Sequence, residues 1–212
     1  MPTPHPTPIY RLIHVENLAV CLKRKGMHAP KHVPADGLSY RTIHNVDIQN
    51  ERGTRQVPCG PCGTIHDYVP FYFGPRSPML LQLHTGRVDG YTEGQKPLIY
   101  VVSTVQAVVE AGLSFVFSDG HGIAAYSRWY YRVADLDEVD WDVVYADRWN
   151  DTVEEPDRQR RKQAEFLVHR FCPWGLVQEI GVLNDTVRNH VVNIIADHGS
   201  SIPVTVRRQW YY

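Results

Sequence analysis

The chain has 212 residues, 43% of them hydrophobic and 21% charged, and a formal net charge of −1. This composition is ordinary for a globular domain with a buried core, and the near-zero charge excludes a protein whose whole surface is built to coat a polyanion. No apolar run approaches the roughly eighteen residues of a membrane span, and the Pro-rich start lacks the apolar centre of a secretion signal.

The first predicted elements are a strand and a helix. Tyr10–His14 alternates in a manner typical of a short strand, and Asn17 can cap a helix that runs to about Lys25 and stops at Gly26. The residues before this strand (1–8) are expected to form a short disordered lead. Further along, the sequence predicts a loop at 30–40, a short helix at 47–52 and a turn at 58–63.

The middle of the chain holds its most apolar segment. Leu98–Val102 predicts a buried strand, and Ser103 with Gln106 forms a capping box for a helix that Gly112 ends. The other expected elements are strands at 114–117, 166–168, 176–182 and 203–212, a tight turn at 118–122, and a helix that Asp185 caps. The inward positions of this helix are expected to be Val187, Val191, Val192, Ile194 and Ile195.

Strands and helices mix along the chain without a regular β-α-β alternation. This order favours an α+β fold over a doubly wound parallel sheet. We therefore expect one domain over residues 9–212. Four cysteines in a chain of this length do not suggest a disulfide scaffold, so a reducing, cytoplasmic location without a membrane partner fits best.

The segment from Ala134 to Arg161 is acidic first and basic afterwards. Its length and polarity are typical of a functional loop or a partly helical excursion. Single-stranded nucleic acids are bound by aromatic rings beside local positive charge. Arg148, Trp149 and the basic run 158–162 are therefore candidates for a surface that binds single-stranded nucleic acid, although such a run is usually a solvated face.

The tetrapeptide Cys59-Gly60-Pro61-Cys62 has the spacing of a thioredoxin-like active site. The residues after it do not resemble a helix start, which that site needs. A zinc site needs two further ligands, and the remaining cysteines and histidines form no second close pair. We expect a tight loop whose cysteines happen to lie two residues apart, with thiol-redox and zinc chemistry as alternatives.

The segment His66–Leu80 is the most unusual part of the sequence. Aromatic rings, prolines and charged side chains stand together in it. A segment that only fills a core would carry fewer polar groups, and a simple loop would carry fewer rings. The pattern indicates the wall of a pocket for a ring-shaped ligand, held by stiff proline-containing turns.

The sequence resembles the DarT family in several places. The most specific is Tyr68-Val69-Pro70-Phe71-Tyr72-Phe73, followed by Ser77-Pro78-Met79-Leu80, and Gln49–Arg55 and Gln163–Val168 support it. The opening Tyr10–His14 also looks like that of the family. The resemblance runs from Ile9 to about Val182, and the Cys59–Cys62 tetrapeptide departs from it.

This resemblance implies an ADP-ribosyltransferase-like fold, in which helices flank a central split β-sheet. It implies a bacterial toxin that transfers ADP-ribose from NAD⁺ to thymine bases in single-stranded DNA, restrained by a macrodomain antitoxin of the DarG type. NAD⁺ is then a co-substrate, and no metal is required. Transfer to RNA or protein on the same fold, or a non-enzymatic module that binds nucleic acid or NAD, are the alternatives.

Two residues match the catalytic positions of the family. Breaking the bond between nicotinamide and ribose builds positive charge on the sugar, and a carboxylate beside it stabilises that charge. Glu165 is expected to supply this carboxylate, and Arg52 is expected to orient the pyrophosphate and to stabilise charge. Arg55 is the alternative arginine. By spacing alone, Glu165 could be a solvated residue beside Lys162.

The resemblance also implies contacts with the two substrates. His14 matches an NAD-contacting histidine, although a histidine in an apolar strand is more often a core residue. Asn17 is expected to contact NAD⁺ or only to cap its helix, and Tyr40 and Tyr72 are expected to stack on nicotinamide. His121 lies in a glycine-flanked turn and is expected near the DNA base, or else in solvent.

Overall fold

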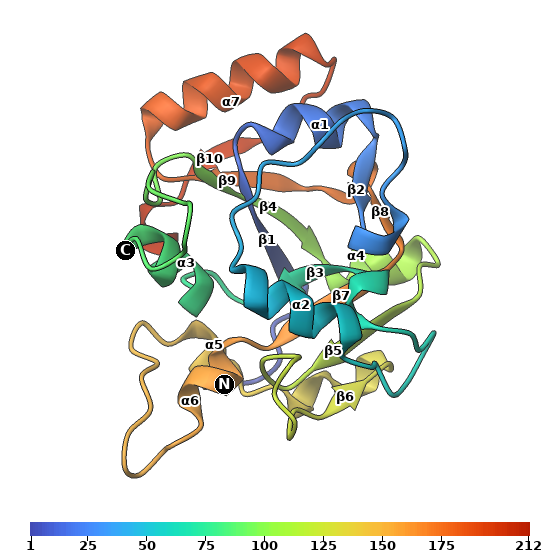
Figure 1. Ribbon diagram of the computed structural model, residues 1–212, viewed down its shortest axis with the longest axis vertical. Coiled ribbons are helices and arrows are strands. Elements are labelled where there is room, and N and C mark those ends of the chain that lie inside the picture. Colours follow the sequence, from blue (N-terminus) through green and yellow to red (C-terminus); the bar gives the residue numbers. More distant parts are fainter.

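An eight-stranded sheet forms the centre of the computed structural model, which describes all residues 1–212 (Figure 1). The strand order is β10-β9-β4-β1-β3-β7-β5-β6, and every neighbouring pair is antiparallel except β10 and β9. The strands are β1 Pro8–His14, β3 Tyr68–Tyr72, β4 Leu98–Thr104, β5 Phe115–Ser118, β6 Trp129–Tyr130, β7 Glu165–His169, β9 Glu179–Val182 and β10 Val204–Val206. A second, two-stranded sheet pairs β2 (Gly26–His28) with β8 (Phe171–Pro173).

The large sheet divides between β1 and β3. All seven residues of β1 pair with β4, but β1 and β3 pair only through Tyr10 and Tyr72. The β10-β9-β4-β1 half is therefore joined to the β3-β7-β5-β6 half at a single point. This arrangement confirms the expected α+β class and the split sheet.

Seven α-helices surround the sheet. They are α1 Asn17–Lys23, α2 Val46–Thr54, α3 Pro78–His84, α4 Val105–Glu110, α5 Trp141–Tyr145, α6 Arg158–Lys162 and α7 Asp185–Asp197. Helices α1 and α7 pack against each other on one side of the fold, and α2 lies across the split end of the sheet (Figure 1). No helix is both long enough and apolar enough to span a membrane.

The core lies on both faces of the sheet, because β4 is buried along its whole length. Phe71, Phe73 and Phe166 belong to its largest cluster of buried apolar side chains. The periodicity of apolar residues therefore identified the central strands correctly. The segment 66–80, expected as a pocket wall, forms β3 and α3.

Several helix caps differ from the prediction by one residue. Thr104, not Ser103, accepts the Ala107 N–H at the start of α4, because the Ser103 hydroxyl donates to the Leu176 carbonyl in the interior. Asn184, not Asp185, caps α7. Along α7 the inward face is narrower than expected, since Val192 is 41% exposed.

Other predicted boundaries also need correction. The expected strand 176–182 begins only at Glu179, and the expected strand 203–212 contains β10 followed by a 3₁₀ turn at Arg208–Trp210. The N-terminal lead has no helix or strand before β1, yet it is held in place: the Trp141 indole N–H donates to the Thr3 hydroxyl at 3.0 Å. The lead therefore packs against Trp141, the first residue of α5.

Candidate active site

A cavity of about 450 Å³ lies where the sheet divides. Its wall includes residues 10–13 of β1 on one side of the split and residues 70–72 of β3 on the other. The segment 40–45 and helix α2 complete it. This volume is in the range of sites that bind small molecules and cofactors.

Arg52 and Glu165 meet at the wall of this cavity. Arg52 lies in the last turn of α2, and Glu165 is the first residue of β7, opposite Tyr72 of β3. The two guanidinium Nη atoms donate to the two carboxylate oxygens at 2.9 and 2.7 Å. The Gly122 backbone N–H donates to Glu165 Oε1 at 3.0 Å. Two residues 113 positions apart thus form one forked ion pair.

This ion pair is almost fully buried, with Arg52 7% and Glu165 2% exposed. Burial alone raises the pKa of Glu165, but the charge and hydrogen bonds of Arg52 outweigh burial and hold that pKa below its ordinary value. Glu165 is therefore an anion at neutral pH. A fixed negative charge beside a cavity is what an electron-poor sugar carbon requires.

Arg55, the alternative to Arg52, points elsewhere. Its Nη2 donates to the Ala124 carbonyl at 3.1 Å, on the segment that follows His121. It forms no hydrogen bond or ion pair with Glu165, so of the two candidate arginines only Arg52 pairs with that carboxylate. Glu165 itself is not the solvated residue that its neighbour Lys162 suggested.

Asn17, Tyr40 and Tyr72 all line the cavity, as expected for residues that contact NAD⁺. Asn17 is the first residue of α1 rather than its cap. Its side-chain amide accepts from the Arg41 N–H at 2.6 Å and donates to the Arg41 carbonyl at 2.9 Å. Asn17 therefore fastens the segment 40–45 over the cavity. The Tyr40 hydroxyl is buried without a hydrogen-bond partner.

His14, predicted to contact NAD⁺, is not among the residues that line the cavity. It ends β1 and is 1% exposed; its Nδ1 accepts from the Glu16 N–H at 3.2 Å, and its Nε2 lies 3.5 Å from Glu93. Arg41 pairs with Glu93 and covers this end of the strand. The geometry gives His14 a supporting position behind the cavity wall.

Arg11 is a cavity residue that the sequence analysis missed. Its Nη1 donates to the Pro70 carbonyl at 2.8 Å, its Nε is buried without a partner, and no carboxylate pairs with it. An arginine without an acidic partner suits an anionic ligand such as a pyrophosphate. The available signal was a charged residue inside an otherwise apolar strand.

His121 lies in the turn that follows β5 and reaches the cavity from the side of Glu165. Its backbone N–H donates to the Arg160 carbonyl at 3.0 Å, and its carbonyl accepts from the Ser127 hydroxyl at 2.7 Å. Burial lowers the pKa of the imidazole, and the nearby Glu165 only partly opposes this. The ring is therefore neutral at pH 7.

The profile described as "DarT: ssDNA thymidine ADP-ribosyltransferase, DarT" matches residues 10–212. The chain belongs to the DarT family. A DNA ADP-ribosyl transferase of Thermus sp. (strain 2.9) is 39% identical over 211 residues, which are 99% of this chain and 98% of that protein.

Solved structures of DarT proteins share this fold. Thermus sp. 2.9 DarT in complex with ADP-ribosylated ssDNA has a TM-score of 0.93 at 38% identity and covers 100% of this chain and 99% of the other. The same protein in complex with NAD⁺ has a TM-score of 0.89 at 38% identity, with both chains fully covered. The DarT fold therefore extends over the whole chain.

Trp149 is not the exposed stacking residue that was expected in this DarT chain. It is 6% exposed, and its indole N–H donates to the Tyr212 hydroxyl at 2.9 Å. Arg148 is exposed, but neither residue lines the cavity. In this structure the Trp149 ring is buried beside the C-terminus and is not exposed for stacking on a base.

We predict that Trp149→Ala lowers the free energy of unfolding by about 3–5 kcal/mol, because it empties a buried aromatic site. Urea unfolding measures this change. At a temperature where the variant is fully folded, its affinity for a single-stranded oligonucleotide should equal that of the wild type. A weaker affinity with unchanged stability would show that the ring stacks on DNA after all.

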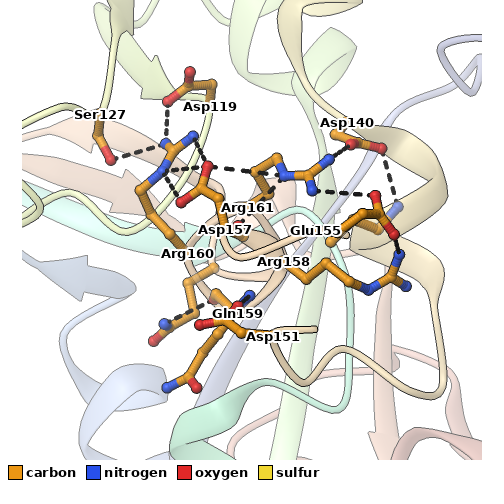
Figure 2. Close-up of polar contacts among 12 residues, drawn as sticks. Asp119, Ser127, Asp140, Asp151, Glu155, Asp157, Arg158, Gln159, Arg160 and Arg161 are labelled. Carbon is orange, nitrogen blue, oxygen red and sulfur yellow. Dashed lines mark hydrogen bonds and ion pairs between the residues drawn. The ribbon is translucent and has the colours of Figure 1, made fainter. Parts of the chain in front are cut away.

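The basic run 158–162 is also not a free cationic surface. Lys162 is buried and donates to the carbonyls of Val144 and Ala146 at 2.7 and 3.0 Å. The three arginines of α6, Arg158, Arg160 and Arg161, each pair with nearby carboxylates (Figure 2). These pairs neutralise the charge of all three arginines.

The Cys59–Cys62 tetrapeptide forms a turn, in which the Cys62 N–H donates to the Cys59 carbonyl at 3.1 Å. Both thiols are free, and no helix starts there. The Tyr68 hydroxyl donates to the Cys62 carbonyl at 2.7 Å and anchors the turn to β3. No group of three or more histidine, cysteine or acidic side chains is placed so that it could hold a metal ion.

Proposed function

We propose that this DarT-family protein transfers ADP-ribose from NAD⁺ to thymidine in single-stranded DNA, with Arg52 and Glu165 as its catalytic residues. The observation that carries the proposal is the buried Arg52–Glu165 pair at the wall of a 450 Å³ cavity. Thermus sp. 2.9 DarT, solved with NAD⁺ and with ADP-ribosylated ssDNA on the same fold, supports it.

The reaction breaks the bond between the ribose C1′ and nicotinamide, and the bonding electron pair leaves with nicotinamide, which becomes neutral. Positive charge builds on the ribose as this bond lengthens. Glu165 stabilises that charge and accepts a hydrogen bond from a ribose hydroxyl, while the Gly122 N–H holds one of its oxygens. A thymine nitrogen then bonds to C1′ and loses its proton.

The other cavity residues hold the dinucleotide. Arg11 and Arg52 supply guanidinium groups for the pyrophosphate. Tyr40 and Tyr72 offer rings for nicotinamide, and Asn17 keeps the segment 40–45 in place. His14 stands behind this set: its Nδ1 accepts from the Glu16 N–H, and its Nε2 is buried without a hydrogen-bond partner.

His121 is proposed to face the acceptor base and to take its proton, since its neutral imidazole lies beside Glu165. We predict that His121→Ala slows transfer about a hundredfold while the KM for NAD⁺ stays within about twofold. His190→Ala, an exposed histidine on α7, is the matched control. Steady-state transfer to a labelled oligonucleotide measures both.

The dependence of the transfer rate on pH is a second test of the proposed role of His121. Because the pKa of His121 lies below the ordinary value, the wild-type rate should be flat from pH 8 down to about 6.5 and fall only below it. A rate that already falls between pH 8 and 7, or His121→Ala with the wild-type rate, would rule out this role.

In the cell, the protein is proposed to act in the cytoplasm as a toxin that a macrodomain antitoxin of the DarG type restrains. The four free cysteines fit a reducing compartment. A Thermosipho africanus DarTG solved with ADP-ribose shares the fold at 17% identity. Growth of a host that expresses the wild-type protein, with and without such an antitoxin, tests this part.

The choice of acceptor is tested with labelled NAD⁺ and separate DNA, RNA and protein acceptors. The proposal predicts label on thymine-containing single-stranded DNA and release of nicotinamide. Label on RNA or protein alone would support the same chemistry on another acceptor. Binding of NAD⁺ without release of nicotinamide would indicate a non-enzymatic module.

A further inference from the structure

We propose that Arg160 is a positioning residue, which holds the loop 119–128 so that the Gly122 N–H stays on Glu165. We call residues 119–128 the Gly122 loop. This inference rests on the proposed function, because Arg160 acts through Glu165. Arg160 itself does not line the cavity.

The Arg160 guanidinium bridges α6 and the Gly122 loop (Figure 2). Its Nη1 donates to Asp119 Oδ1 at 2.6 Å and to Ser127 Oγ at 3.1 Å, at the two ends of the loop. Its Nε and Nη2 donate to the Asp157 carboxylate at 2.9 and 2.8 Å. One side chain thus joins both ends of the loop to the helix before Glu165.

The contacts within the loop carry this restraint to Gly122. The Ser127 hydroxyl donates to the His121 carbonyl, and the His121 N–H donates to the Arg160 carbonyl. The next residue, Gly122, donates its N–H to Glu165. A Cβ atom at Gly120 would overlap the Arg160 guanidinium, so the loop backbone lies directly against the arginine.

The loop connects β5 and β6 without a helix or strand of its own. Besides Arg160, side chains outside the loop that hold it include Arg55, which donates to the Ala124 carbonyl, and Ser118, which donates to the Gly120 carbonyl. A hydrogen-bond donor contributes to catalysis when it is fixed before the reaction starts. An N–H on a mobile loop would lose that advantage, and small misplacements can slow a reaction about a hundredfold.

A direct contact between Arg160 and a DNA phosphate is the competing explanation. A guanidinium has five N–H groups. Asp119, Ser127 and Asp157 take both of those on Nη1, the one on Nε and one of the two on Nη2. The side chain is also only 11% exposed. The observed geometry therefore favours positioning over phosphate binding.

The test compares Arg160→Gln with Arg158→Gln, a matched change on the same helix. Arg158 pairs with Glu155 and does not touch the Gly122 loop. We expect Arg160→Gln to lower kcat for transfer roughly ten- to a hundredfold, with the KM for NAD⁺ within about twofold of wild type. Arg158→Gln should keep the wild-type kcat, and Arg160→Lys should restore part of the loss. Rates are corrected for the folded fraction from urea unfolding.

Asp119→Asn provides the second line of evidence. It leaves Arg160 in place but weakens the ion pair, so kcat should fall as in Arg160→Gln, and the double variant should be no slower than the slower single variant. A phosphate-binding Arg160 predicts the opposite: removal of the acid leaves kcat unchanged, and Arg160→Gln raises the KM for the oligonucleotide and reduces its salt dependence. That result would overturn the proposal.

Glu165→Gln, measured in the same series, distinguishes failure of the positioning role of Arg160 from failure of the proposed catalytic site. If Glu165→Gln is inactive and Arg160→Gln is as active as Arg158→Gln, the positioning role is wrong and the proposed function stands. If folded Glu165→Gln transfers ADP-ribose at the wild-type rate, the proposed catalytic site is wrong.

Discussion

Glu165→Gln should lower the rate of ADP-ribose transfer to single-stranded DNA about a hundred- to a thousandfold, the effect expected when a group aimed at transition-state charge is lost. Glutamine has the shape of glutamate and can still accept the Gly122 N–H, but it lacks the negative charge that faces the ribose. The KM or Kd for NAD⁺ should change much less. Steady-state transfer to a thymine-containing oligonucleotide measures the rate.

The matched control is Glu179→Gln. Glu179 on β9 forms a forked pair with Arg207, with donor–acceptor distances of 2.7 and 3.0 Å, on the half of the sheet away from Glu165. Removing its charge breaks a similar pair without touching the cavity. This variant should keep the wild-type kcat. Equal losses in both variants would show that the effect of Glu165→Gln comes from general destabilisation.

Stability must be measured alongside activity. Glu165 is not an exposed group whose removal would leave the fold unchanged. The side chain is 2% exposed, and its loss leaves the buried charge of Arg52 without a partner. Breaking such a pair costs about 3–5 kcal/mol, so activities are compared per folded molecule.

The second large effect is expected from Arg52→Met. This change leaves Glu165 buried and unpaired, which costs about 3–5 kcal/mol of unfolding free energy and removes the charge that holds its pKa down. Burial then raises that pKa, so the carboxylate is lost at low pH and any residual transfer should increase as the pH rises. Urea unfolding and a pH–rate profile measure the two effects.

Arg52→Met combined with Glu165→Leu separates stability from catalysis. Removing both charges at once should recover much of the lost stability, because apolar residues of similar size often replace a buried ion pair without loss. Transfer should remain absent. A double variant that regains activity together with stability would contradict the catalytic assignment of both residues.

The sequence predicted the parts of the fold that depend on local pattern. The apolar run at Leu98–Val102 and the periodicity after Asp185 correspond to β4 and α7. The predicted helix caps were wrong by one residue where two neighbouring polar side chains could each have capped the helix. At α4, Ser103 faces the interior and bonds Leu176, which leaves Thr104 to cap the helix.

The site was less predictable, because its contacts join distant parts of the chain. Pattern alone did not distinguish Glu165 from a surface acid. The family resemblance favoured Glu165 and Arg52 but left Arg55 as an alternative. Trp149 beside Arg148 resembled a stacking surface, but the partner that buries its ring is Tyr212 at the end of the chain. Local sequence contains no signal for such a contact.

The role of the basic run 158–162 was also not predictable from local sequence. Four cations in five positions resemble a polyanion site, yet Asp119 and Asp140, which neutralise two of them, lie on other elements. The run therefore stabilises the Gly122 loop and α5 instead of presenting free charge (Figure 2). Only the folded structure shows where these carboxylates lie.

Mass spectrometry of a single-stranded oligonucleotide with one thymine, after incubation with NAD⁺ and the wild-type protein, tests the central claim most directly. We predict that the oligonucleotide gains one ADP-ribose, located on the thymidine, that an oligonucleotide without thymine gives no product, and that folded Glu165→Gln forms the product about a hundred- to a thousandfold more slowly. Equal modification of the thymine-free oligonucleotide, or by Glu165→Gln, would contradict the account.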